Sequence, residues 1–336
     1  IVEERPSDQI ELSGGYGFQR VILTLGLSFN NFSLKNIFNK SAWQPLPAGD
    51  GQTFSIRGQA NGRFFQSYNL SFSEPWLGGK KPTSFSFWAN HSRMDHGGLF
   101  GNVGGSSKIN ITGVGIGIGK RLKWPDDYFT IQHELSYNYY DISNGGMFFA
   151  INNGYGNMFA YRVALSRNSI SDFIYPRGGS RVTLSFKTTP MYSLFDGIDD
   201  YSDFTQAELF KYIEMFKTKF TGEYYFPLTR DKKLVLMNRF GFAFMGAYSA
   251  NKGVSPMERY YMGGSGLTGI GMMDGREIVA LRGYDDQPGP HISSAQGDPI
   301  AAKFTMELRY PISLNPSATF FLLGFAEAGN TYRLAR

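Results

Sequence analysis

Apolar and polar residues alternate with a period of two along most of the chain, and sustained helical periodicity is hard to find. Segment 65–74 shows the pattern clearly, because one phase holds small polar residues and the other holds apolar ones. These residues are Ser67, Asn69, Ser71 and Ser73 against Tyr68, Leu70 and Phe72. Such alternation predicts a β-strand with one polar face that contacts water and one apolar face.

Segments 83–90 and 113–119 alternate in the same way, and in the second one glycine takes every position on one face. The other face consists of Val114, Ile116 and Ile118. A loose G-x-G pattern also occurs in dinucleotide-binding loops, but that fingerprint needs a glycine turn that opens a helix. Glycines at every second position indicate one face of a strand instead.

The same alternation predicts about thirteen strands, many of them about ten residues long, which is the length that a tilted strand needs to cross a bilayer. The expected strands are 9–18, 20–30, 52–62, 65–74, 82–92, 108–121, 127–141, 155–167, 179–189, 212–226, 233–249, 301–311 and 318–330. We therefore predict an all-β fold, a transmembrane antiparallel β-barrel.

The connectors between these strands fall into two sets. Tight ones occur at 74–83, 122–127 and 227–233, and long polar ones occur at 31–51, 93–107 and 190–211. Outer-membrane barrels have short periplasmic turns and longer extracellular loops, so we expect the two sets on opposite sides of the barrel. A soluble all-β protein is the alternative, but its strands would be shorter and its loops less uneven.

Composition supports the barrel. Aromatic residues make up 16 % of the 336 residues, charged residues only 18 %, and there are 41 glycines. Mean hydropathy is −0.26 and no apolar run reaches about 18 residues, which excludes a helical membrane protein but not a strand barrel. Without cysteine there is no disulfide scaffold or thiolate metal site. The net charge is +5, and acidic and basic residues are interspersed along the chain, so no basic tract for nucleic-acid binding is expected.

Several separated stretches carry a family resemblance, and their order and spacing agree over nearly the whole chain. They are "EERPSDQIELSGGYG" (3–17), "ISDFIYPRGGSRVTLSFK" (170–187), "RYYMGGSG" (259–266), "LRGY" (281–284), "KFTMELRYPI" (303–312) and "FAEAGNTY" (325–332). Together they resemble the barrel domain of the BamA family of outer-membrane protein insertases, in the superfamily that includes TamA, Sam and Toc proteins.

The resemblance implies a domain layout. Residues 1–8 would be the end of the last periplasmic POTRA domain, and 9–336 the barrel, with residues 250–300 as a loop docked in the lumen. The family barrel has about sixteen strands, so we expect the natural protein to continue on both sides, with the closing strands absent here. An extra segment, "LTGIGMMDGREIVA" at 267–280, separates the GGSG and LRGY motifs.

The LRGY motif is expected to latch this loop to the wall. Arg282 offers a planar fork of donors that suits carboxylates. Glu307 should face the lumen by strand phase, because Phe304, Met306 and Leu308 form the opposite, apolar face. Glu327 is expected there by the family motif. Gly283 would allow a sharp turn and Tyr284 would pack against the inner wall. An exposed loop arginine is the alternative.

The first strand raises a second hypothesis, because Gly14, Gly15 and Gly17 lie close together in it. Glycine weakens a strand, and a weak strand at a barrel seam can open and pair with an incoming strand by β-augmentation. These glycines would then form a lateral gate. Alternatively, they relieve crowding in a curved wall.

The expected function is therefore insertion of client barrels into the outer membrane of a Gram-negative bacterium, without nucleotide or cofactor. A related polypeptide transporter, TamA-like or of the two-partner secretion type, and a passive diffusion porin are the alternatives. The resemblance implies as partners unfolded barrel clients, BamD-like accessory lipoproteins, periplasmic chaperones and membrane lipids. No catalytic triad can be assembled, so an enzyme is not expected. The histidines are dispersed without metal-ligand spacing: His91, His96, His133 and His291.

Overall fold

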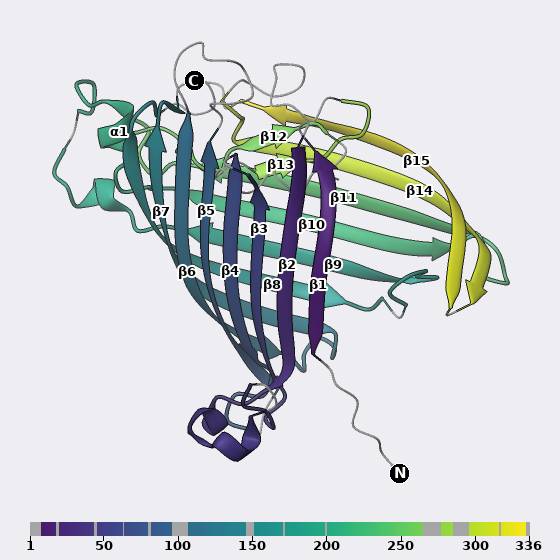
Figure 1. The fold of residues 1–336 in the computed structure, drawn as a ribbon. Helices are drawn as coiled ribbons and strands as arrows, with labels where there is room; N and C mark the ends of the chain where they lie inside the picture. Colours follow the sequence, from purple (N-terminus) through teal and green to yellow (C-terminus); the bar gives the residue numbers. More distant parts are fainter. Residues whose placement is uncertain are drawn as a thin grey trace.

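Most of the chain forms one β-sheet. The computed structural model describes residues 8–17, 20–43, 46–62, 64–79, 82–95, 107–145, 151–170, 172–198, 200–264, 277–284, 296–315 and 317–333. The expected POTRA end at 1–8 lies outside these residues except for Asp8. Thirteen strands join in one antiparallel sheet, in which strands adjacent in sequence are neighbours except that β11 pairs with β14 (Figure 1).

The strands follow the predicted ones, and their ends differ by a few residues. They are β1 (Gln9–Gly17), β2 (Arg20–Phe32), β3 (Gln52–Asn61), β4 (Phe65–Glu74), β5 (Thr83–Asp95), β6 (Lys108–Arg121), β7 (Phe129–Ser143), β8 (Gly154–Asn168), β9 (Gly179–Thr188), β10 (Phe216–Pro227), β11 (Val235–Gly246), β14 (Ile300–Asn315) and β15 (Ala318–Tyr332). Strands β12 (Tyr260–Met262) and β13 (Glu277–Val279) form a separate parallel pair. The predicted all-β fold is confirmed.

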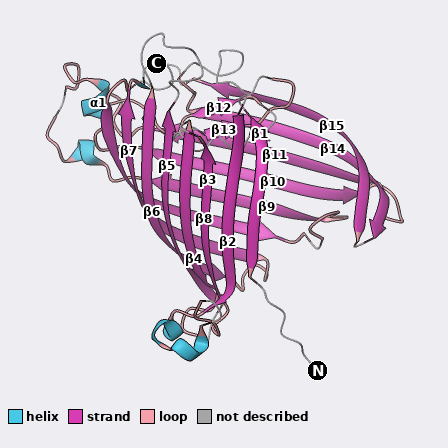
Figure 2. Cartoon of the chain, in the orientation of Figure 1, coloured by secondary structure: helices cyan, strands magenta, loops and turns pink. Residues whose placement is uncertain are grey.

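Helical segments in the described part of the chain are short (Figure 2). They are the 3-10 helices η1 (Lys35–Phe38), η2 (Lys40–Ala42) and η4 (Tyr192–Leu194) and the single-turn helix α1 (Gln206–Leu209). None of the helices within the described ranges has the length and apolar character needed to cross a membrane.

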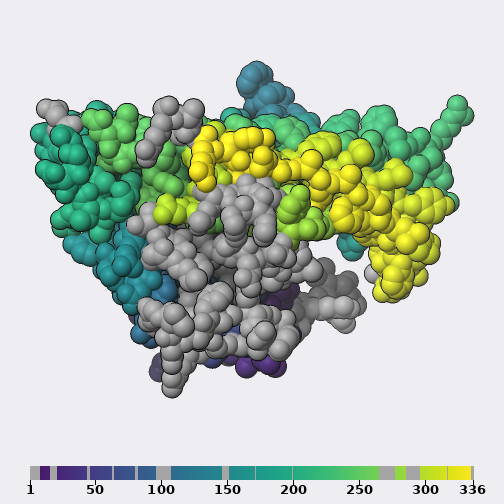
Figure 3. Space-filling model, turned by 90° about the horizontal axis from the view of Figure 1, so that it is seen from above, coloured from purple at the N-terminus to yellow at the C-terminus, as the bar shows by residue number. Residues whose placement is uncertain are grey.

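The sheet wraps around an interior. Strands β1 to β7 stand upright at the front of Figure 1, and β9 to β11, β14 and β15 pass behind them at an angle. Strands β1 and β15 are the two ends of the sheet and do not pair with each other in the described structure. Viewed from above (Figure 3), the yellow strand β15 lies beside yellow-green parts of the chain that precede it. The small β12–β13 pair belongs to this interior and contacts β14 and β15.

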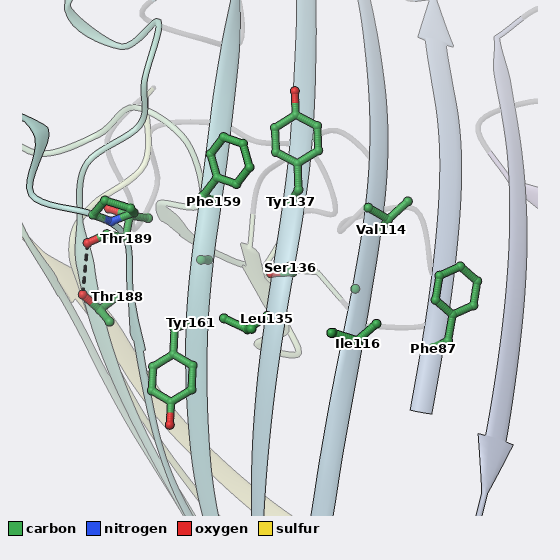
Figure 4. Close-up of a pocket in the computed structure, with 13 residues that line it drawn as sticks. Phe87, Val114, Ile116, Leu135, Ser136, Tyr137, Phe159, Tyr161, Thr188 and Thr189 are labelled. Carbon is green, nitrogen blue, oxygen red and sulfur yellow. Dashed lines mark hydrogen bonds between the residues drawn. The ribbon is translucent and has the colours of Figure 1, made fainter. Parts of the chain in front are cut away.

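Alternating side chains give the sheet an apolar outer face, whereas the inner face combines polar side chains with the apolar cluster against which the loop segments near β12 pack. Val114, Ile116 and Ile118 of β6 are between 42 % and 47 % exposed on the outer face, as predicted. Figure 4 shows Val114 and Ile116 with Phe87, Leu135 and other apolar side chains of β5 to β8, around a shallow hollow of about 610 Å³. Such an exposed apolar wall suits contact with lipid acyl chains.

The glycines of β6 are explained by crowding on the inner face. A Cβ atom added to Gly115 would lie 2.4 Å from the Trp88 ring, and one added to Gly113 would lie 2.3 Å from Asn138 Oδ1 and Asn90 Oδ1. Side chains from the two flanking strands therefore lie flat over β6 and occupy the space that a larger residue would need. Glycine at alternate positions is required here for packing, and the dinucleotide interpretation is not needed.

The predicted separation of tight and long connectors is wrong for one of them. In an antiparallel sheet, successive connectors alternate between the two sides, so the loop 33–51 after β2 lies on the same side as the tight turns after β4, β6 and β10. Figure 1 shows η1 and η2 at that lower end, near the N-terminus. The long connector 189–215 lies on the opposite side, as expected, and residues 96–106 lie outside the described residues. Connector length therefore predicted the wrong side of the sheet for the 31–51 loop, because the side of each connector is set by its place in the order of the strands.

Candidate loop-docking site

The tip of the loop between β11 and β14 reaches two buried carboxylates on the inner wall. Arg282 Nη2 lies 3.5 Å from Glu307 Oε1 on β14 and 3.4 Å from Glu327 Oε1 on β15. The Arg282 backbone N–H donates to Glu327 Oε2 at 3.2 Å. The structure thus brings together the three charged residues on which the expected latch depends.

Strand register explains why the two acids meet. Glu307 is paired with Phe325, and Thr305 is paired with Glu327, so the acids lie diagonally on the same face of neighbouring strands. The opposite face carries Phe304 and Met306, which are 45 % and 41 % exposed. Diagonal positions in an antiparallel pair are about 7–8 Å apart, a separation that one guanidinium group can bridge.

Each acid also has a second cation on the wall. Lys303 Nζ lies 3.2 Å from Glu327 Oε1, and Arg309 Nη2 lies 2.6 Å from Glu307 Oε2. Both carboxylates are only 5 % exposed, whereas the Arg282 side chain is 39 % exposed. The charges therefore alternate from Lys303 to Arg309 through Glu327, Arg282 and Glu307. Arg282 links two acids that already have partners, so its removal would leave neither carboxylate without a cation.

The residues around Arg282 fix its approach. Its guanidinium carbon lies 3.8 Å from the centre of the Phe325 ring, a cation–π contact that suits the planar group. Leu281 is buried, and Lys303 Nζ donates to the Ala280 carbonyl. Gly283 has a φ of +90°, a conformation that glycine adopts without strain, so the expected sharp turn is present. Tyr284 is 50 % exposed, which differs from the expected packing against the inner wall.

A buried tyrosine supports β14 and β15 at the lower end of the interior. Tyr175, from the "IYPRGGS" stretch before β9, is 1 % exposed and packs edge-on against Phe321 of β15 at 5.4 Å. Its hydroxyl lies 2.7 Å from the Lys233 carbonyl oxygen and 3.0 Å from that of Arg309. The turn at 169–178 is therefore tied to the strand that carries Glu307 and Arg309.

Replacing Tyr175 with phenylalanine should lower the thermal stability of the barrel. The change removes the hydroxyl of the buried Tyr175 and its contacts with the Lys233 and Arg309 carbonyls, at a cost of about 1 kcal/mol. Heat-modifiable electrophoretic mobility measures the temperature at which the folded band disappears. Tyr310→Phe, on the exposed outer face of β14, is the matched control and should leave that temperature unchanged. Equal behaviour of the two variants would contradict the role of the Tyr175 hydroxyl.

The glycines of β1 differ from those of β6. A Cβ atom added to Gly15 would meet no heavy atom within 4 Å, and one added to Gly14 would lie 3.8 Å from Leu23, an ordinary contact. Gly17 pairs with Arg20 at the end of the β1–β2 ladder. Crowding in a curved wall therefore does not explain Gly14 and Gly15. All nine residues of β1 pair with β2, and the structure shows no second strand partner for β1 among the described residues.

Sequence reasoning found the acids but did not assign roles to their neighbours. Lys303 and Arg309 share the strand phase of Glu307, so the same period of two could have identified both. Phe325 lies two residues before Glu327 and could have been identified only through the family motif that gave Glu327. Tyr175 gave no comparable signal, because its partners are backbone carbonyls of distant segments.

Comparisons with known proteins agree with this geometry. BamA from Haemophilus ducreyi lacking POTRA domains 1–3 is similar, with a TM-score of 0.65 and 17 % identity over 98 % of this chain and 59 % of that chain. CdiB from Escherichia coli has a TM-score of 0.50 and 11 % identity over 98 % of this chain and 57 % of that chain. The chain thus spans less than two thirds of either protein, and at these identities the likeness shows the fold alone. No curated protein matches the sequence. The model of the Omp85 superfamily domain matches residues 48–335, and the chain belongs to that superfamily.

Proposed function

We propose that this chain is the barrel of an outer-membrane insertase, which folds client β-barrels and inserts them through a lateral seam at β1. A client strand would join the free edge of β1 by β-augmentation, and its backbone hydrogen bonds would template the next strands without nucleotide. Superfamily membership supports a β-barrel in the outer membrane of a Gram-negative bacterium. Accessory lipoproteins and periplasmic chaperones are expected partners on the side of the tight turns, which outer-membrane barrels turn toward the periplasm.

The observation that carries the proposal is the combination of glycine and space in β1. Gly14 and Gly15 have room for a side chain, yet glycine makes a strand less stable than almost any residue that could replace it. Weak pairing at the edge of a sheet lowers the free energy needed to bend or rotate that edge. An edge that must accept successive client strands benefits from this weakness.

A polypeptide transporter of the same superfamily is the second candidate. Its substrate would pass through the lumen, which requires the lumen to clear. Here the loop segments near β12 are buried against the wall: Met257, Tyr260 and Leu281 belong to the same apolar cluster as Met245 of β11 and Ala301 of β14. This packing favours a route along the sheet edge. It also disfavours a passive porin, whose function needs an open, polar constriction.

Cysteine crosslinking to a stalled client tests the route. Because the chain has no cysteine, single cysteines at positions 10 to 15 give a clean background. β-Augmentation should crosslink consecutive positions, both lumen-facing and outward-facing, to consecutive residues of the client's terminal strand. Outward-facing Ile116→Cys on β6 and lumen-facing Ser86→Cys on β5 are the controls. Crosslinks at Ser86→Cys without β1 crosslinks would support a transporter, and would overturn the insertase proposal.

A further inference from the structure

A second charged cluster holds the base of the same loop. Lys187 of β9 and Lys217 and Lys219 of β10 project from the wall toward two acids of the loop, Glu258 and Glu277. Lys187 Nζ lies 2.5 Å from Glu258 Oε1, and Lys217 Nζ lies 3.4 Å from Glu258 Oε2 and 2.6 Å from Glu277 Oε2. Lys219 also pairs with Glu277. We name these five residues the base cluster.

Strand phase places the lysines together. Lys187 and Lys217 are paired directly across β9 and β10, and Lys219 lies two residues further on the same face. Like charges opposite one another destabilise a sheet, so this wall needs acids close to it. The loop provides them from two separate segments, Glu258 just before β12 and Glu277 at the start of β13. The parallel β12–β13 pair holds both segments side by side.

Four residues of the base cluster are well buried, and the fifth, Lys219, has a side chain that is 45 % exposed. The Lys217 side chain is 7 % exposed, and those of Glu258 and Glu277 are 19 % and 18 % exposed. Lys217 Nζ also donates to the Glu258 backbone carbonyl at 2.9 Å and lies 4.6 Å from the centre of the Tyr260 ring. Burial alone would favour the neutral form of Glu258, but the positive charges of Lys187 and Lys217 lower the pKa of this carboxyl to about 2. Glu258 is therefore ionised at physiological pH.

The base cluster and the tip differ in charge polarity and in strength. At the base the wall is positive and the loop is negative, whereas at the tip Arg282 is positive and the wall acids are negative. Opposite polarities at two points allow one docked orientation and penalise the reverse. The Arg282 side-chain contacts, at 3.4 and 3.5 Å, are longer than the closest contacts of Lys187 and Lys217, at 2.5 and 2.6 Å. The Arg282 side chain is 39 % exposed, whereas that of Lys217 is 7 % exposed. The tip is therefore the weaker of the two attachments.

We propose that the base cluster is the fixed anchor of the loop and that it stays closed when the Arg282 tip leaves Glu307 and Glu327. Release of the tip would then move Arg282, at the turn formed by Gly283, while the buried Leu281 and the β12–β13 pair stay in the interior. The end of the extra segment at 267–280 would then have a role in anchoring the loop, because it supplies Glu277 and strand β13. This inference concerns loop position and does not depend on the proposed insertase activity.

A disulfide reporter can measure whether the loop base is docked. A Cβ atom added to Gly329 of β15 would lie 2.8 Å from Met262 Sδ of β12, so these two positions face each other. Met262→Cys with Gly329→Cys, treated with an added oxidant in the full-length protein in membranes, should form a disulfide at a rate that reports how often the loop base is docked. Lys217→Met in this background should slow disulfide formation by roughly tenfold or more, because it leaves buried acids short of a cation. Arg282→Glu, which puts a third carboxylate beside Glu307 and Glu327 and releases the tip, should change the rate less than about twofold, because the base cluster holds the loop without the tip. Lys123→Met, on an exposed turn, is the control for loss of a lysine.

Two further variants keep the test decisive if Lys217→Met does not fold, which heat-modifiable mobility would reveal. Lys219→Met removes only the contact with Glu277, and Glu258→Gln removes one loop charge. Both should slow the reporter, and together they should be less than additive if they act in one cluster. The proposal fails if folded base variants oxidise as fast as the parent, or if Arg282→Glu slows the reporter as much as they do. Client assembly is measured separately, so failure of the insertase proposal would leave this result unaffected.

Discussion

Replacing Arg282 with glutamate should release the loop tip and abolish most assembly of client barrels. The substitution puts a third carboxylate beside Glu307 and Glu327, which are each 5 % exposed. Turning a buried attraction into a repulsion costs about 3–5 kcal/mol, which lowers the ratio of docked to released tip by roughly a hundredfold or more. The measurement is the level of several outer-membrane barrels in cells that are depleted of the wild-type copy and express the full-length variant.

Milder changes at Arg282 should give a graded series. Arg282→Met adds no negative charge, and Lys303 and Arg309 continue to neutralise the two acids, so its cost should be only about 1 kcal/mol. Arg282→Lys keeps the charge but loses the planar contact with Phe325. We therefore expect client assembly to fall in the order wild type, Lys, Met, Glu. Equal defects for Met and Glu would show that repulsion by the wall acids is not the cause.

A second-site change separates charge from folding. Glu327→Lys in the Arg282→Glu background restores opposite charges between the tip and β15 and should recover part of the assembly. The recovery should be incomplete, because a lysine at 327 restores a charge pair but cannot accept the hydrogen bond that the backbone N–H of residue 282 donates to Glu327. Normal client assembly by a well-folded Arg282→Glu variant would falsify the proposed role of the tip.

The period of two explains how much of this site was accessible from the sequence. It assigned Glu307 to the inner face without any relative, because Phe304, Met306 and Leu308 occupy the other phase. Glu327 needed the family motif, since residues 320–326 are apolar on both faces. Phase within a strand depends only on local sequence, so it can be read from the chain directly.

The base cluster could not be read in that way. It joins Lys187 and Lys217, which meet only through the register of β9 and β10, to Glu258 and Glu277, which meet through a short parallel pair inside the lumen. Register and loop path are set by contacts between distant residues, and alternation carries no information about them. The prediction for the 31–51 loop was wrong for a related reason. It used the length of the connector, whereas the side of the sheet on which a connector lies is decided by its place in the order of the strands.

Replacing Gly15 of β1 with valine should reduce client insertion while it stabilises the barrel. A β-branched residue favours the strand, and no heavy atom lies within 4 Å of the added Cβ position. With Gly14→Val, which makes only an ordinary contact with Leu23, the gain should be about 1–2 kcal/mol. This gain would lower the population of the state in which β1 is less tightly paired with β2 by roughly five- to thirtyfold. Insertion rate of a client into vesicles that contain the full-length variant measures the effect.

Gly241→Val is the matched control, because Gly241 also faces the lumen and its Cβ position has only one backbone oxygen nearby, at 4.0 Å. It lies in β11, which is paired on both sides, so stiffening this strand should leave client insertion unchanged. Gly115→Val is different, because its side chain would collide with Trp88 and should destabilise the barrel itself. If Gly15→Val and Gly241→Val insert clients equally well, the weakness of β1 has no part in insertion. If only the β1 variants are slow, and their barrels are more stable than the parent, slow insertion cannot be attributed to misfolding. It then follows from the loss of flexibility at the edge that clients must join.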